Sequence, residues 1–246
     1  MNSKKKRNSN VRRGIRICCV ILLSPLLIAV PASAQATLDW SMVTWDDGDL
    51  SNSYILGNGV EISITVSTTA LGTFINATPL VETPYIDGVG HTQNLFGTEL
   101  DLGVIFNPFP MQGMSPVLID IGFSEAVTDL IFDISDIDYS VGGGGEDDRL
   151  DQVVVTSNAG DPTLTPLMAG SATFTVAGNT ATAISGQSAD PLTDNGTVRV
   201  TFPDGVTDVT ITYNEASGNN NPAGRGIGLL AMFTETPVDL QSFSIE

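Results

Sequence analysis

Beyond its first 34 residues the chain has no cysteine, no lysine and a single histidine, His91. The lack of cysteine excludes disulfides and thiol catalysis there. A lone histidine completes neither a zinc site nor a catalytic triad, so we assign His91 no chemical role. The only cations of residues 35–246 are Arg149, Arg199 and Arg225, against 28 acidic residues, which gives a formal net charge of −25.

Such a charge repels nucleic acid and anionic lipid surfaces, so neither is an expected partner. It favours solubility and the binding of divalent cations. Adaptation to a salty medium, in which counterions screen the self-repulsion, is a compatible explanation of the same composition.

The first 34 residues have the pattern of a secretory signal peptide. A basic stretch ends at Arg16, an apolar stretch runs from Ile17 to Val30, and Ala32-Ser33-Ala34 fits a cleavage site. The apolar stretch is short and contains Pro25, which favours cleavage after Ala34 over an uncleaved membrane anchor. We therefore expect a secreted or cell-surface protein with no membrane insertion after cleavage.

The rest of the chain shows the period of β-strands and no sustained helical period. In one segment Ile119, Ile121 and Phe123 would share a face of a half-buried strand. Turn-forming Gly, Pro, Asn and Asp residues separate about ten such segments. This pattern predicts one all-β domain over residues 35–236, an antiparallel two-sheet sandwich or jelly roll, followed by a C-terminal strand or linker at 237–246. The predicted strands are 60–66, 99–106, 119–124, 130–134, 151–156, 172–176, 181–185, 196–202, 206–213 and 227–233.

An internal repeat supports the two-sheet prediction. Residues 119–134 align without gaps on residues 198–213, and apolar residues recur at matching positions. The identical pairs are Phe123/Phe202, Val127/Val206, Thr128/Thr207 and Asp129/Asp208. We interpret each copy as a hairpin, a strand followed by a short turn and an antiparallel return strand.

Acidic residues and glycines gather after the first copy of the repeat. Seven carboxylates lie between Asp133 and Asp151, with Arg149 the only cation among them. If the core-facing register of strand 130–134 continued, it would include two aspartates, and burying unpaired charge is costly. The loop after them leads to strand 151–156, which would bring Asp151 close.

Carboxylates at such short range favour a bound cation, and calcium is the oxygen-seeking ion expected outside a cell. The alternative is a solvated acidic loop tip. The predicted calcium ligands are Asp136, Asp138 and Asp151, with one of Asp147 and Asp148 as a contribution from the loop.

Trp40 and Trp45 are the only tryptophans. Paired surface tryptophans can stack on sugars, which would make the chain a carbohydrate-binding module. Near the start of a domain such residues more often anchor the core. No nucleophile elbow, HExxH motif or Cys/His arrangement is present, so we expect a non-catalytic protein, with a polysaccharide-active enzyme as the alternative.

Residues 38–234 carry a resemblance whose most specific part is Asp133 to Val155. The pattern F-x-x-x-V-T-D-L-x-F-x-I-x-D-I-D, a glycine-rich acidic loop, D-x-V-x-V and the later GIGLLAMF resemble secreted bacterial β-sandwich modules of large surface and adhesin-like proteins. The resemblance implies an extracellular, non-catalytic module with calcium. We expect a binding or surface-structural role, with a polysaccharide or a cell-surface protein as the partner. Separately, the final PVDLQSFSIE is similar to the junction that precedes a type IX secretion sorting domain.

Overall fold

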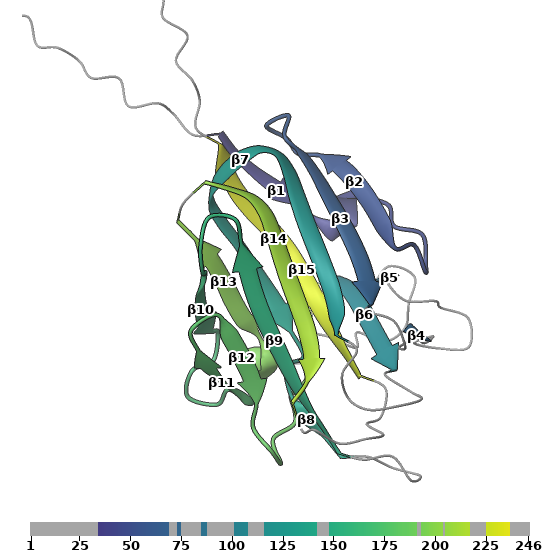
Figure 1. The fold of residues 1–246 in the computed structure, drawn as a ribbon, viewed down its shortest axis with the longest axis vertical. Coiled ribbons are helices and arrows are strands. Elements are labelled where there is room, and N and C mark those ends of the chain that lie inside the picture. Colours follow the sequence, from purple (N-terminus) through teal and green to yellow (C-terminus); the bar gives the residue numbers. More distant parts are fainter. Residues whose placement is uncertain are drawn as a thin grey trace, which may run out of the picture. The chain divides into compact units, whose positions relative to one another are not determined.

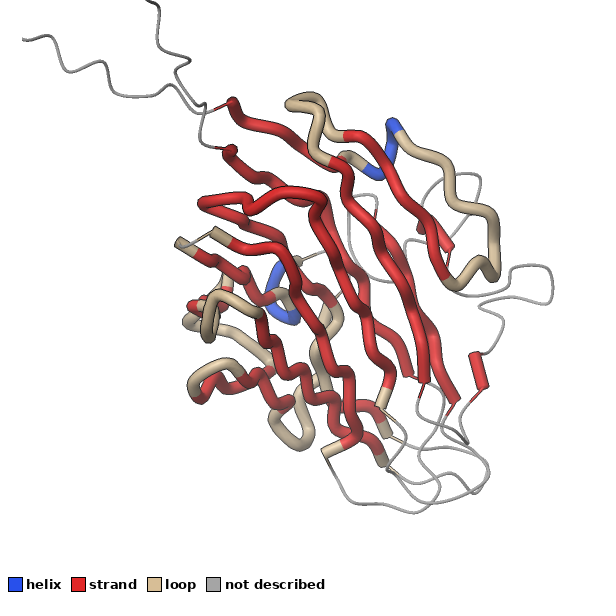
Figure 2. Tube along the Cα trace, turned by 45° about the horizontal axis from the view of Figure 1, so that its top comes forward, coloured by secondary structure: helices blue, strands red, loops and turns tan. Residues whose placement is uncertain are grey.

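The computed structural model describes residues 34–68, 73–74, 85–87, 101–107, 116–141, 148–190, 193–203, 205–216 and 225–236. These residues form antiparallel strands and two short 3-10 turns, η1 (Trp40–Met42) and η2 (Asp194–Gly196), as Figure 2 shows. The prediction of an all-β antiparallel fold is confirmed. Within the described residues no helix has the length and apolar character needed to cross a membrane.

The strands are β1 (Ala34–Leu38), β2 (Ser51–Ile55), β3 (Glu61–Thr68), β4 (Thr73–Phe74), β5 (Tyr85–Asp87), β6 (Asp101–Asn107), β7 (Val117–Ser135), β8 (Tyr139–Ser140), β9 (Arg149–Ser157), β10 (Thr163–Pro166), β11 (Phe174–Ala177), β12 (Thr180–Ala183), β13 (Val198–Phe202), β14 (Val206–Glu215) and β15 (Arg225–Thr236).

The strands form two layers joined by a shared strand (Figure 1). In the first layer, here called sheet I, the order is β2-β3-β7-β14-β9-β12-β11. In the second, sheet II, the order is β10-β13-β7-β15, and both β6 and β1 pair with the far side of β15.

The shared strand is β7, the long teal strand of Figure 1. Its first half pairs with β3 and β14 in sheet I, and its second half pairs with β13 and β15 in sheet II. The buried residues of its first half are odd-numbered, Val117 to Phe123 and Val127, whereas from Leu130 to Ile134 the even-numbered residues are buried. The alternation shifts by one residue at Asp129, which has a φ of 50°. Aspartate tolerates this left-handed conformation better than most residues.

The predicted hairpins are wrong. Residues 119–134 form one sheet-crossing strand, and residues 198–213 cross in the opposite direction as β13 and β14. β13 pairs with the second half of β7 and β14 with the first half, so the two copies of the repeat pair with each other. Seven matching positions are buried in both copies: 119/198, 121/200, 123/202, 127/206, 130/209, 132/211 and 134/213.

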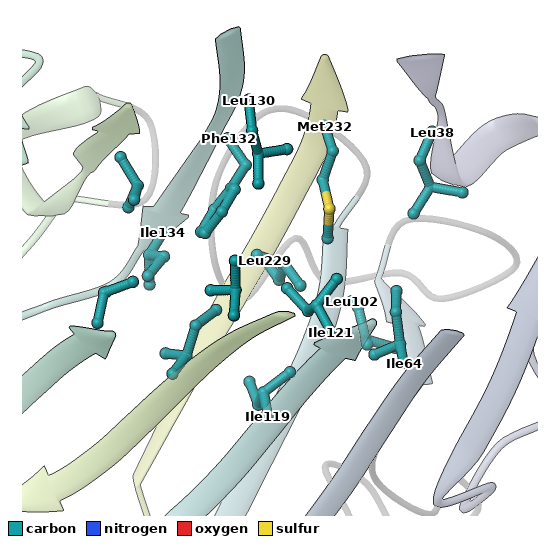
Figure 3. Packing of buried hydrophobic residues seen from close by; sticks show 14 of the residues in the cluster. Leu38, Ile64, Leu102, Ile119, Ile121, Leu130, Phe132, Ile134, Leu229 and Met232 are labelled. Atoms are coloured by element: carbon teal, nitrogen blue, oxygen red, sulfur yellow. The ribbon is translucent and has the colours of Figure 1, made fainter. Parts of the chain in front are cut away.

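The core lies between the two sheets (Figure 3). Ile119 and Ile121 come from the part of β7 in sheet I, and Phe132 comes from its part in sheet II. The ring of Phe132 lies 6.5 Å from that of Phe202, centroid to centroid. Burying a side chain of this size stabilises the fold by about 1.5–3 kcal/mol, which explains why the repeat keeps its inward pattern.

Candidate functional site

The predicted carboxylate site lies where β7 ends. The strand register does not continue unbroken, because Asp136 has a φ of 64° and is only partly buried. Ser135, Ile137 and Asp138 around it are buried. The Ile137 N–H donates to the Gly196 carbonyl at 3.0 Å, and the Ile137 carbonyl accepts from Thr173 Oγ1 at 2.7 Å. A Cβ on Gly196 would lie 2.6 Å from that of Ala189, so only glycine allows this approach.

Asp138 and Asp151 meet, as the sequence predicts. The Asp151 N–H donates to the Asp138 carbonyl at 3.0 Å, and the Asp138 N–H donates to Asp151 Oδ2 at 3.3 Å. Asp151 is 2% exposed, and its Oδ1 accepts from the hydroxyl of the fully buried Tyr213 at 2.7 Å. The two ends of the loop that joins β7 to β9 are therefore fastened together by a carboxylate.

Two further groups donate hydrogen bonds to the side chain of Asp138. Its Oδ2 accepts from the Ala189 N–H at 2.8 Å, and its Oδ1 accepts from Ser140 Oγ at 3.4 Å. Burial raises the pKa of the Asp138 carboxyl, while the Ala189 N–H, the Arg149 charge and the Ser140 hydroxyl act in the opposite direction. Burial outweighs the three because none of them replaces the lost hydration in full.

Sequence reasoning missed a third buried carboxylate, Glu215. It lies opposite Asp151 in the pairing of β14 with β9 and is 8% exposed. Its Oε1 accepts from the Leu150 N–H at 3.0 Å. A signal was available, because Glu215 continues the inward register of Val209, Ile211 and Tyr213.

The remaining predicted ligands lie apart from this contact or outside the described residues. Asp148 is exposed and accepts from the Tyr139 hydroxyl at 2.7 Å. That hydrogen bond to a carboxylate raises the pKa of Tyr139. Asp147 is outside the described residues, and so is His91, which was not a predicted ligand.

The described carboxylates do not by themselves form a calcium site. In the part of the chain that the structure describes, no three acidic, histidine or cysteine side chains gather closely enough to hold a metal ion. Calcium takes six to eight oxygens, whereas Asp138 and Asp151 already accept hydrogen bonds from the protein. A calcium ion would need oxygens from residues 142–147, which lie outside the described residues.

Trp40 and Trp45 are core residues, so neither ring is available to stack on a sugar. They are 1% and 6% exposed. Trp45 Nε1 donates to the Asp49 carbonyl at 3.1 Å, whereas Trp40 Nε1 finds no hydrogen-bond partner among the described residues. Of the two interpretations of this pair, the structure supports the core anchor.

The chain's own residues carry the evidence for its function, because no family model, curated protein or solved structure matches the chain.

Proposed function

We propose that the chain is a secreted or cell-surface binding and structural module without catalytic activity, and that calcium stabilises its acidic loop. The observation that supports this most directly is the contact between Asp138 and Asp151. Both side chains are buried, and the contact joins the two ends of the loop.

The charges at the loop base support the calcium part of the proposal. Asp138, Asp151 and Glu215 are all buried, and Arg149 is the cation whose charge acts on Asp138. Burial disfavours the charged form of the Asp138 carboxyl, and a divalent cation held by the loop would favour that charged form. The hydrogen bonds to these carboxylates support a structural role over acid/base catalysis, which requires a group presented to a substrate.

Export and surface location are part of the same proposal. They follow from the signal-peptide pattern of residues 1–34 and from the resemblance to secreted surface modules. Residues 1–33 and the sorting-junction resemblance at 237–246 lie outside the described residues.

Thermal unfolding tests the calcium part. We expect millimolar calcium to raise the Tm above its value in excess chelator. At a hundred times the dissociation constant the ion would add about 2.7 kcal/mol, or roughly 5–10 °C for a domain of this size. Asp151→Asn should lose most of the increment, and the exposed Asp129→Asn should keep it. Equal Tm values with calcium and with chelator would contradict the proposal, and so would an increment that survives in Asp151→Asn.

A further inference from the structure

The outer face of sheet I contains a hollow that the loop site does not include. Two rows of outward residues cross β3, β7 and β14 there, Thr65–Asp120–Thr210 and Ser63–Gly122–Asp208. The hollow has a volume of about 280 Å³, and the strand residues Ile121 and Val209 complete its lining.

Gly122 lies at the centre of the hollow, and its lack of a side chain leaves that space open. A glycine inside a strand weakens it, and it often marks a bulge or a place where a ligand or another backbone approaches closely. The pairing of β14 with β7 shifts register between Val206 and Asp208, beside the pair of Asp208 with Gly122. The strand itself does not require glycine, because Thr201 occupies the matching position in the second copy of the repeat. A Cβ on Gly122 would lie 2.8 Å from Ser63 Oγ, which donates to the Gly122 carbonyl at 3.3 Å and would have to rotate away from that carbonyl. The glycine therefore keeps the outer face open.

The hollow has two exposed carboxylates and no lysine or arginine among the residues that line it. Asp120 Oδ1 accepts from Thr210 Oγ1 at 2.6 Å, and Asp208 Oδ2 accepts from Thr207 Oγ1 at 2.6 Å. Each carboxylate has a second oxygen with which to accept a hydrogen bond from a ligand. An ionised carboxylate only accepts, whereas the serine and threonine hydroxyls both donate and accept.

We propose that this hollow binds one or two units of a neutral polysaccharide, an inference that rests on the proposed role as a binding module and names its ligand class. Sugar hydroxyls supply the donors that two carboxylates need, and an anionic ligand would be repelled. The volume is near the lower end of small-molecule sites and far above that of a bare ion.

The face around the hollow fits a chain-like ligand. The row through Asp120 continues to Ser51 on β2 and to Thr156 on β9, and the row through Gly122 continues to Ser53. All three of these side chains are short, polar and exposed. Further sugar units thus meet hydroxyls on both sides of the hollow. No aromatic ring lines it, so the expected affinity is weak and the assay must detect weak binding.

Affinity electrophoresis tests the proposal. The chain would be run through native gels that contain laminarin, galactomannan, xyloglucan or soluble starch, and through gels that contain the anionic alginate, with and without calcium. We expect retardation by at least one neutral polysaccharide and none by alginate. Gly122→Val should abolish the retardation, and Asp208→Asn should lower the association constant about tenfold, the usual effect of losing a hydrogen bond to a charged group.

Two control variants match these substitutions. Asp129→Asn changes the aspartate at the position equivalent to Asp208, and Thr201→Val changes the residue equivalent to Gly122. Both should bind like the unmodified chain. Asp208→Asn keeps the side-chain shape, so it tests the site even if Gly122→Val fails to fold by circular dichroism.

Several outcomes would overturn the proposal and leave the loop site standing. They are no retardation by any of the four neutral polysaccharides, retardation unaffected by Asp208→Asn, and retardation by alginate alone. If the increase in Tm with calcium were lost in Asp208→Asn, the hollow would be a cation site, and the polysaccharide proposal would be overturned. Retardation by a neutral polysaccharide without any effect of calcium on the Tm would support binding in the hollow and contradict only the proposal that calcium stabilises the loop.

Discussion

The two copies of the repeat, residues 119–134 and 198–213, have the same inward face and different outward faces. Their seven matching buried positions pack the same core. On the outside, Gly122 and Asp120 of the first copy line an open acidic hollow, to which the second copy contributes Asp208 and Thr210. At the positions that match Gly122 and Asp120, the second copy has Thr201 and Arg199, and Arg199 binds both carboxylate oxygens of Asp133 at 2.9 and 2.8 Å. Packing fixes the inward residues of a sheet-crossing strand, and its outward residues are free to take separate roles.

The largest expected change in stability tests whether the inward faces of the two copies are equivalent. Phe123 and Phe202 match in the repeat and are both buried. Each Phe→Ala change should lower the free energy of unfolding by about 3–5 kcal/mol, because it leaves a cavity in the core. Chemical denaturation measures the change, and Phe233→Ala, at a residue 41% exposed, is the control with a smaller loss. A cost below about 1 kcal/mol at only one of the two positions would show that the copies pack differently.

An intermediate effect is expected where the inward faces differ. Tyr213 matches Ile134, but its hydroxyl donates to the buried Asp151. Tyr213→Phe removes that donor and should cost about 1–3 kcal/mol, because a buried carboxylate loses a hydrogen bond. In a double-mutant cycle with Asp151→Asn, the two losses should not add. Additive losses would show that the hydroxyl stabilises something other than Asp151.

The smallest expected change in stability tests the difference between the outward faces, at Thr201 and Gly122. Thr201→Gly should destabilise the chain by about 0.5–1 kcal/mol, the cost of a glycine inside a strand. Gly122→Thr, made together with Ser63→Ala to relieve the contact, should stabilise it by a similar amount. The same denaturation curves measure both. If the double variant is instead less stable by more than 1 kcal/mol, Gly122 is required for folding rather than for an open surface.

The sequence predicted strands well where alternation is long. The segments 60–66, 151–156 and 206–213 lie within β3, β9 and β14, apart from Val60. β2 and β10 were missed because they are short and mostly polar, and β10 ends in a proline. Their pairing with β3 and β13 holds them in place, and no local pattern reports such pairing.

The hairpin error has a similar cause. The segments SEAVTD and PDGVTD suit a tight turn equally well, and only the neighbours in space decide that the chain crosses between sheets instead. For the site, the approach of Asp138 and Asp151 was predicted for the wrong reason. The sequence suggested that strands 130–134 and 151–156 are antiparallel neighbours, whereas the described strands β7 and β9 do not pair, and the two residues meet because β8 pairs with the start of β9. The Ala189 and Tyr213 donors were not predicted, because they come from segments 51 and 62 residues away in sequence.

The membership of β7 in both sheets has a consequence for when this chain can fold. β7 completes its pairing only when β13, β14 and β15 are present, and β15 also holds β1 in place from the opposite end of the described sequence. Contacts between such distant segments slow folding and leave early segments without their neighbours. In a chain that emerges N-terminus first, β2, β3 and the first half of β7 can pair early, whereas β1 and the second half of β7 must wait for β13 and β15.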